Sequence, residues 1–222
     1  MVSTPLRPGD AAPHVTLPAD NREGQVSLED YRGRSPVLVC LFRGLHCPFC
    51  RRQLVQLSTT QDKLKALGVE TMAVVNTPLE RARLYFKYRP ARVLLAADPE
   101  AATHRSFGVP AGMVVEKESE ASWAQGKLTM GQLLALKIDP TGELPAPQDP
   151  FTAMDILNKQ DGFEVTETDK QIAQAHGTQM TGHFLIDREG IIRWEHIECA
   201  ERLEDLSKFP SDDEILRAAR SL

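Results

Sequence analysis

PVLVCLFRGLHCPFC, residues 36–50, joins a continuous apolar run to two cysteines that are three positions apart. An apolar run such as PVLVCLF, residues 36–42, is typical of a strand that is buried on both faces of a sheet. The residues that follow repeat leucine at near-helical spacing as far as Gly68, a candidate for the end of a helix. Cys47 and Cys50 are therefore predicted to lie where a strand passes into a helix. Three interpretations of this pair are open: a redox couple, half of a metal site, or two thiols that lie close together by chance.

The position of Cys47 at the start of the predicted helix favours redox chemistry. A thiolate is the reactive form of cysteine, and a helix N-terminus lowers a thiol pKa from its ordinary value of about 8.5. Pro48 suits the first helical position, and Cys50 follows about one turn later, within reach of a mixed disulfide on Cys47. We therefore interpret Cys47 as the attacking thiol and Cys50 as the resolving thiol.

Four basic side chains, Arg43, His46, Arg51 and Arg52, surround the two cysteines in the sequence. Arg43 and His46 are expected either to add positive potential that favours a thiolate or, respectively, to be a solvated side chain and a packing residue. Arg51 and Arg52 are expected to be solvated. The candidate catalytic residues are Cys47, Cys50, Arg43 and His46.

The remaining cysteines and histidines do not suggest a metal site. Structural zinc takes four ligands, commonly from two separated pairs, and the chain has no second C-x-x-C and no H-x-x-x-H. The partners worth considering are His176, His183 and His196. Cys40 lies inside the apolar run and is expected to be a small buried hydrophobe, while Cys199 is a lone thiol.

No cofactor is expected, because two sulfurs can carry both electrons of a redox reaction. Glycine-rich loops of the dinucleotide or P-loop kind are also missing from the sequence.

Alternating strand and helix patterns follow the cysteines. VETMAVV (69–75) and RVLLAAD (92–98) are predicted strands, and the segments 78–88 and 99–107 are predicted helices. This alternation implies a mixed central sheet with helices on both faces.

Short elements are predicted at both ends of the chain. An edge hairpin and a helical turn capped by Ser27, with Asp30 three residues on, precede the apolar run. A second hairpin at 183–197 turns at Glu189 and Gly190, and a helix capped by Ser211 and Glu214 closes the chain.

Residues 108–178 are not explained by this alternation. A stretch of more than about 60 residues between two sheet strands exceeds an ordinary loop, so it is predicted to contain structure of its own. We interpret it either as a lid or substrate-specificity element, or as an elaboration for dimerisation or packing.

Composition excludes several classes of protein. The chain has 222 residues, 41% hydrophobic, a net charge of −5 and scattered Lys and Arg, which indicates a soluble globular protein without a nucleic-acid or membrane partner. Neither a signal peptide nor a transmembrane run is recognisable, so the expected location is cytoplasmic. Four cysteines are too few for a disulfide scaffold, and in a reducing compartment a close pair more often cycles.

Residues 6–54, LRPGDAAPHVTLPADNREGQVSLEDYRGRSPVLVCLFRGLHCPFCRRQL, resemble the opening of the AhpC/TSA (redoxin) family, the peroxiredoxin-like branch of the thioredoxin superfamily. TGHFLIDREGIIRW, residues 181–194, resembles the closing hairpin of that family. The resemblance implies a single thioredoxin-like α/β domain over residues 1–222, with an insertion at about 108–178 before the last hairpin. It further implies reduction of peroxides or disulfides through Cys47, and a possible homodimer.

Certain positions depart from the family pattern. Cys40 and Gly44 stand where peroxiredoxins have a proline and a threonine or serine, and Thr181 or Gly182 stands where they have an arginine. The cis-proline that thioredoxins and glutaredoxins have in that same region is missing as well. Arg43 is a candidate replacement for the guanidinium.

We therefore expect a cysteine-based thiol-disulfide oxidoreductase. Cys47 would attack a disulfide or hydroperoxide, Cys50 would resolve the adduct, and a thiol donor would restore the dithiol. That donor would be a thioredoxin- or glutaredoxin-like protein or glutathione. One alternative is a thiol-dependent peroxidase for organic hydroperoxides, with an apolar pocket supplied by the insertion. Another is a non-catalytic module that senses redox state or binds a partner.

Overall fold

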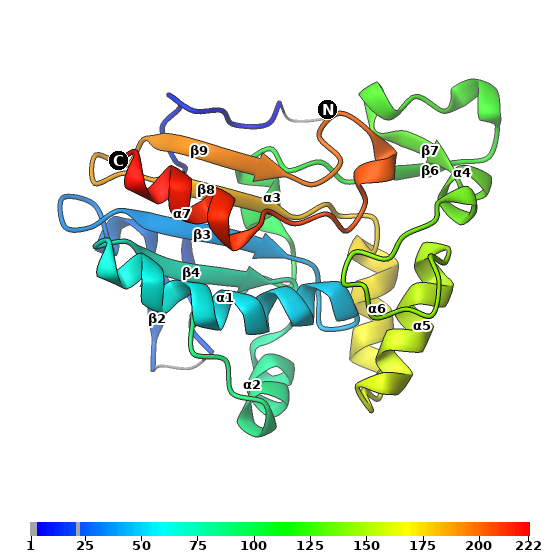
Figure 1. Ribbon diagram of the computed structural model, residues 1–222, viewed down its shortest axis with the longest axis horizontal. Coiled ribbons are helices and arrows are strands. Elements are labelled where there is room, and N and C mark those ends of the chain that lie inside the picture. Colours follow the sequence, from blue (N-terminus) through cyan, green and yellow to red (C-terminus); the bar gives the residue numbers. More distant parts are fainter. Residues whose placement is uncertain (1–3, 21–22) are drawn as a thin grey trace.

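The computed structural model describes residues 4–20 and 23–222, and a five-stranded mixed sheet lies at its centre (Figure 1). The strand order is β5-β4-β3-β8-β9. Strands β3, β4 and β5 are parallel, β8 is antiparallel to β3, and β9 is antiparallel to β8. The bounds are β3 Val37–Phe42, β4 Glu70–Val75, β5 Leu94–Ala97, β8 Gly182–Ile186 and β9 Ile192–Ile197. The predicted mixed sheet is confirmed.

Strand β3 is buried along its whole length. It pairs with β4 along its whole length on one side and with β8 from Val37 to Leu41 on the other. Side chains pack on both faces of the neighbouring strand β8: the ring of His183 lies 5.5 Å from that of Phe42, and the ring of Phe184 lies 4.6 Å from that of Phe107. A continuous apolar run is what such a central strand requires.

Helices flank this sheet, with α1 Pro48–Ala66 and α7 Asp212–Arg220 on the face toward the viewer in Figure 1. Helix α1 ends where Gly68 adopts a left-handed φ of 74°, as predicted. Helix α2 Leu79–Tyr88 follows Pro78, and α3 Ala102–Ser106 begins later than the predicted helix 99–107. The delay has a local cause: Ala101 is left-handed, and the Asp98 carboxylate accepts hydrogen bonds from the first two backbone N–H groups of α3.

The terminal elements also follow the expected pattern. Strands β1 Thr16–Pro18 and β2 Gln25–Ser27 pair antiparallel, and the bend of this hairpin, residues 21–22, lies outside the described residues. Ser27 caps the 3₁₀ turn η1 Leu28–Asp30 in a capping box. Ser211 and Glu214 form the predicted capping box of α7.

Segment 108–178 contains its own strands and helices and lies beyond the carboxyl end of β3, beside the start of α1 (Figure 1). Leu128 and Leu157 of this segment belong to the same hydrophobic core as the central sheet, which favours the single-domain arrangement. Its elements are β6 Met113–Val115, η2 Glu118–Glu120, η3 Trp123–Gln125, β7 Lys127–Thr129, α4 Met130–Ala135, α5 Pro150–Gln160 and α6 Glu167–His176. After β9 comes one further turn, η4 Leu203–Asp205.

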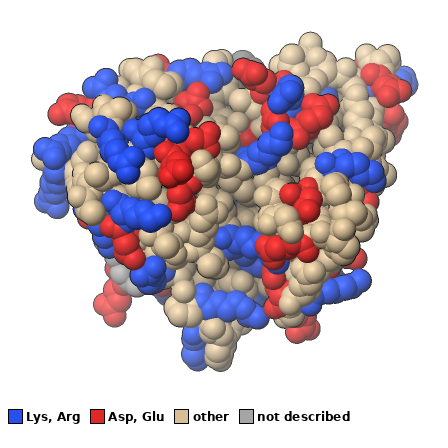
Figure 2. All heavy atoms as spheres, in the orientation of Figure 1, with Lys and Arg blue, Asp and Glu red and all other residues tan. Residues whose placement is uncertain are grey.

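Basic and acidic side chains are interspersed over the surface viewed in Figure 2. Of the helices within the described part of the chain, none has both the length and the apolar character needed to span a bilayer.

His183 is a neutral imidazole in the core. It is fully buried between Phe42 and Phe209, and neither ring nitrogen has a hydrogen-bond partner among the described residues. Burial, with a smaller contribution from His196, lowers the pKa of His183 to about 3.

Replacing His183 with phenylalanine should therefore weaken the acid sensitivity of folding. Unfolded His183 binds a proton below about pH 6.5, whereas the folded imidazole does so only near its pKa of about 3. Stability from this residue is full above about pH 6.5 and falls as the pH drops toward 3, by about 1.4 kcal/mol per pH unit. When the pH is lowered from 7 to 5, the free energy of unfolding measured with urea should fall by about 2 kcal/mol less for His183→Phe than for wild type. The exposed His14, changed to Phe, is the control, and an undiminished loss in His183→Phe would contradict the expectation.

Candidate active site

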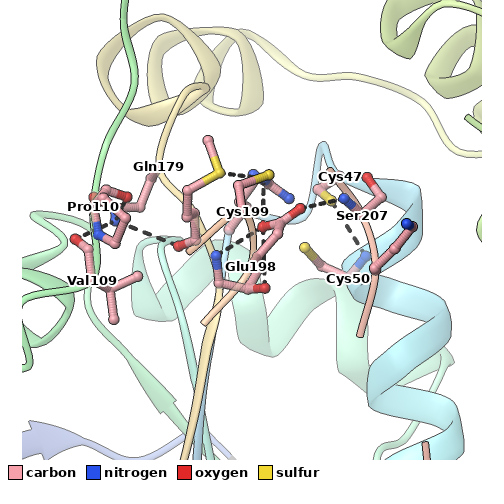
Figure 3. Close-up of polar contacts among 12 residues, drawn as sticks. Cys47, Cys50, Val109, Pro110, Gln179, Glu198, Cys199 and Ser207 are labelled. Carbon is pink, nitrogen blue, oxygen red and sulfur yellow. Dashed lines mark hydrogen bonds and ion pairs between the residues drawn. The ribbon is translucent and has the colours of Figure 1, made fainter. Parts of the chain in front are cut away.

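Cys47 is the N-cap residue of α1, and its sulfur accepts a hydrogen bond from the backbone N–H of Cys50 at 3.3 Å (Figure 3). Pro48 occupies the first helical position, where its missing N–H costs nothing. Both cysteines are free thiols and only 2% exposed. The structure thus brings the two predicted redox residues together on the first turn of one helix.

The environment of Cys47 favours its thiolate. Burial by itself raises the pKa of Cys47, but hydrogen bonds from the thiol and backbone N–H of Cys50, together with the charge of Arg43, outweigh it and lower the pKa to about 7. Near neutral pH a large fraction of Cys47 is therefore ionised.

Cys50 behaves in the opposite way. Burial, the hydrogen bond to Cys47 and the negative charge of Cys47 raise the pKa of Cys50 well above its ordinary value. The pair therefore carries one thiolate and one proton, with the charge on Cys47. When Cys47 forms a covalent adduct its charge disappears, which removes one reason for Cys50 to hold its proton.

Arg43 is buried next to Cys47 and bound to a carboxylate that the sequence did not single out. Its Nη2 donates to Glu198 Oε2 at 2.7 Å, and the Glu198 side chain has no exposed surface. The Glu198 carboxylate also accepts hydrogen bonds from the Thr181 backbone N–H and hydroxyl and from the Ser207 N–H (Figure 3). Glu198 therefore fixes the guanidinium that faces Cys47.

The loop after Glu198 is strained where it supports this carboxylate. Cys199 has φ 54° and Ser207 has φ 64°, a region that non-glycine residues rarely adopt. Nothing in the local sequence marks Glu198 as buried, because an acidic residue at the end of a strand ordinarily faces water.

His46 lies at the same site but is not a source of positive charge. Burial, followed by repulsion from Arg43, lowers the pKa of His46 to about 4, so the imidazole is neutral at neutral pH. Its Nδ1 has no hydrogen-bond partner among the described residues. Of the two side chains predicted to add positive potential at Cys47, Arg43 is therefore the one that does so.

The expectation that Arg51 and Arg52 are solvated is wrong. Arg51 is only 5% exposed, and its guanidinium donates to the Leu45 carbonyl at 2.6 Å and to Asp161 at 2.6 Å. Arg52 is half-buried and binds Glu143 at 2.7 Å and Asp161 at 2.9 Å. These bonds hold segment 108–178 against α1.

Cys40 and Cys199 lie outside the redox pair. Both are buried, and burial raises the pKa of each thiol, so both stay protonated. Cys40 is the small buried hydrophobe that was predicted. Within residues 4–20 and 23–222, no three His, Cys, Asp or Glu side chains are grouped as a metal ion requires, and this includes the histidines considered above.

An apolar pocket of about 280 Å³ opens over Cys47. Arg43, His46 and Cys47 line it and are themselves buried. Segment 108–178 contributes most of the apolar lining through Val114, Leu128, Met130, Leu133, Phe151 and Met154. A wider groove of about 1030 Å³ runs between α1 and α2, but no cysteine lines it.

Comparison with solved structures gives the same fold. A putative thiol:disulfide interchange protein DsbE from Chlorobium tepidum is 22% identical, with a TM-score of 0.54 over 97% of this chain and 96% of the other. The reduced 2-Cys peroxiredoxin of Plasmodium vivax is 16% identical, with a TM-score of 0.58 over 97% and 81%. The peroxidoxin BcpB of Mycobacterium tuberculosis is 12% identical, with a TM-score of 0.58 over 98% of both chains. The search of curated proteins gives no match.

The sheet, the helix-capping Cys47 and its partner Cys50 define a thiol-based redox protein with a thioredoxin-like fold. Residues 8–126 match the AhpC/TSA family, and the chain belongs to that family. The expected family and the expected thioredoxin-like α/β fold are confirmed, while the interpretation of residues 108–178 as an insertion stays a prediction.

Proposed function

We propose that this protein is a thiol-disulfide oxidoreductase of peroxiredoxin-like type that uses Cys47 as nucleophile and Cys50 as resolving thiol. The observation that carries the proposal is the unequal pair: Cys47 has a pKa lowered to about 7, while burial and Cys47 keep Cys50 protonated one helical turn away. Such an arrangement supplies an attacking thiolate and, next to it, a second thiol with a proton to give.

With a disulfide, the Cys47 thiolate attacks one sulfur and expels the other as a thiolate. A bond forms between Cys47 and the substrate sulfur, and the substrate disulfide bond breaks. Cys50 then loses its proton and attacks the Cys47 sulfur, which releases the second substrate thiol and leaves a Cys47–Cys50 disulfide. The substrate has gained two electrons, and an external dithiol, or two thiols, returns two electrons to the protein.

With a hydroperoxide, the thiolate attacks the terminal oxygen, the O–O bond breaks, and the alkoxide leaves as an alcohol after taking a proton from solvent. Cys47 becomes a sulfenic acid. Cys50 attacks its sulfur, and the hydroxyl leaves as water with the Cys50 proton. Arg43, a lining residue, would face the developing negative charge, and neutral His46, also a lining residue, would offer the substrate a hydrogen bond.

A second candidate function, a thiol-dependent peroxidase for organic hydroperoxides, is favoured by the apolar pocket over Cys47. A thioredoxin- or glutaredoxin-like protein or glutathione is the proposed electron donor. We place this chemistry in the cytoplasm, since a reducing compartment would keep the pair cycling. Sedimentation equilibrium tests the homodimer that the family resemblance suggests.

The test begins with the reduced wild-type protein. Absorbance near 240 nm should titrate Cys47 with a pKa well below about 8.5. Rapid mixing with hydrogen peroxide, cumene hydroperoxide and a small disulfide should form a Cys47–Cys50 disulfide, identified by peptide mapping. The fastest oxidant separates peroxidase from disulfide reductase. An unshifted pKa with slow oxidation by all three would contradict catalysis and favour a binding or sensing module.

A further inference from the structure

The pocket over Cys47 contains no cation that is free to meet an anionic substrate. Among the described lining residues, Arg43 is the one with a permanent charge, and that charge is paired with Glu198 at 2.7 Å. His46 is neutral. With Cys47 ionised, the group formed by Arg43, Glu198 and Cys47 carries a net charge of −1.

The neighbouring arginines do not change this balance. Arg51 and Arg52 lie one turn further along α1, but neither lines the pocket, and both are bound to Asp161. Their guanidinium groups connect α1 to segment 108–178 and are not directed at a substrate.

The mouth of the pocket is apolar as well. Val114, Met130 and Phe151 line it and remain substantially exposed to solvent. Exposed apolar side chains gathered around a concave site are typical of a surface that binds an apolar ligand. Gln174 and Thr178 are polar lining residues without charge.

We infer that this pocket selects uncharged, apolar disulfides and hydroperoxides and rejects those with an anionic group near the reacting bond. The inference deepens the proposed function and rests on it. A carboxylate beside the reacting atoms would lose hydration in an apolar site and would lie close to the Cys47 thiolate, with no unpaired cation to compensate. Glutathione disulfide, which carries several carboxylates, would therefore be a poor substrate. Because thiol-disulfide exchange is reversible through the same mixed disulfide, the inference also favours a protein dithiol over glutathione among the proposed electron donors.

Two aromatic disulfides provide the test: neutral dithiodipyridine and anionic dithiobis(nitrobenzoate). In each case the Cys47 thiolate attacks the disulfide and releases one coloured thiol, after which Cys50 gives up its proton and displaces the second. The first release needs no turnover and no electron donor. Rates with mercaptoethanol supply the intrinsic ratio of the two reagents, and Cys47→Ser supplies the background.

We expect the ratio of the rate with dithiodipyridine to the rate with dithiobis(nitrobenzoate) to be at least about ten times larger for Cys47 than for mercaptoethanol. Gln174→Lys, which adds a cation at the pocket wall, should reduce this excess at least about threefold. Gln171→Lys is the matched control, because Gln171 is an exposed glutamine of the same helix that does not line the pocket, and it should leave the ratio unchanged. Any general effect of either lysine on the thiolate cancels in the ratio.

The two ideas fail in different ways. Rapid reaction with both reagents at the mercaptoethanol ratio would overturn the selectivity while leaving the proposed function intact. Slow reaction of Cys47 with both reagents, no faster than a free thiol at the same pH, would instead contradict the proposed function. A ratio that changes equally in Gln174→Lys and Gln171→Lys would also overturn the assignment of selectivity to the pocket.

Discussion

Changing Cys47 to serine is expected to slow oxidation of the protein by about a thousandfold or more, because a hydroxyl at this site is not ionised at neutral pH. Changing Cys50 to serine is expected to have a different consequence. Cys47 should still react once, but the product should stop as a mixed disulfide or a sulfenic acid, and steady-state turnover should be lost.

Rapid quenching followed by intact-mass analysis distinguishes the two variants. Cys47→Ser should show no early mass change, whereas Cys50→Ser should gain one substrate thiol or one oxygen. Cys199→Ser, the same change at a buried thiol outside the pair, should cycle like wild type. Continued turnover in Cys50→Ser would mean that another thiol resolves the adduct. Normal oxidation of Cys47→Ser would remove Cys47 from the mechanism.

The features that the sequence predicted are those set by neighbouring residues. A buried central strand is visible as a continuous apolar run in β3, and the N-cap position of Cys47 follows from Pro48 and the leucine spacing. Capping boxes at Ser27 and Ser211 depend on residues only three positions apart. In each case the physical cause lies within one or two turns of the chain.

The features that the sequence did not reveal depend on distant residues. Arg43 and Glu198 are 155 positions apart, and Arg51 and Asp161 are 110 positions apart. An arginine beside a reactive cysteine shows the same local pattern whether it faces water or a buried carboxylate, so Arg51 was wrongly expected to be solvated. The pairing of Arg43 depends on how β9 and the loop after it return to the end of β3.

Glu198→Gln is expected to lower the pKa of Cys47 further below its value of about 7. In the wild type the Glu198 charge raises the pKa of Cys47 and neutralises Arg43. Glutamine keeps a hydrogen-bond acceptor of similar shape but removes this charge. The positive charge of Arg43 is then no longer neutralised and stabilises the Cys47 thiolate more strongly. The 240 nm titration should therefore move to lower pH, whereas a merely structural role for Glu198 would leave it unmoved.

The same change should destabilise the fold in a way that depends on pH. Breaking a buried ion pair costs about 3–5 kcal/mol, and in Glu198→Gln the Cys47 thiolate takes over part of the pairing with Arg43. The pKa of Cys47 in the folded variant then lies further below its value of about 8.5 in the unfolded chain. At pH values between these two, folding releases a proton from Cys47. The free energy of unfolding therefore rises as the pH increases across this range. Urea unfolding of Glu198→Gln should thus show a larger loss of stability, relative to wild type, at pH 5 than at pH 8.

Glu143→Gln is the control for this experiment. Glu143 pairs with Arg52 but is 46% exposed, so removing its charge should cost about 0–1 kcal/mol of stability and leave the Cys47 titration unchanged. An equal loss of stability at both pH values, with an unaltered Cys47 titration, would show that Glu198 does not act on the thiolate through Arg43.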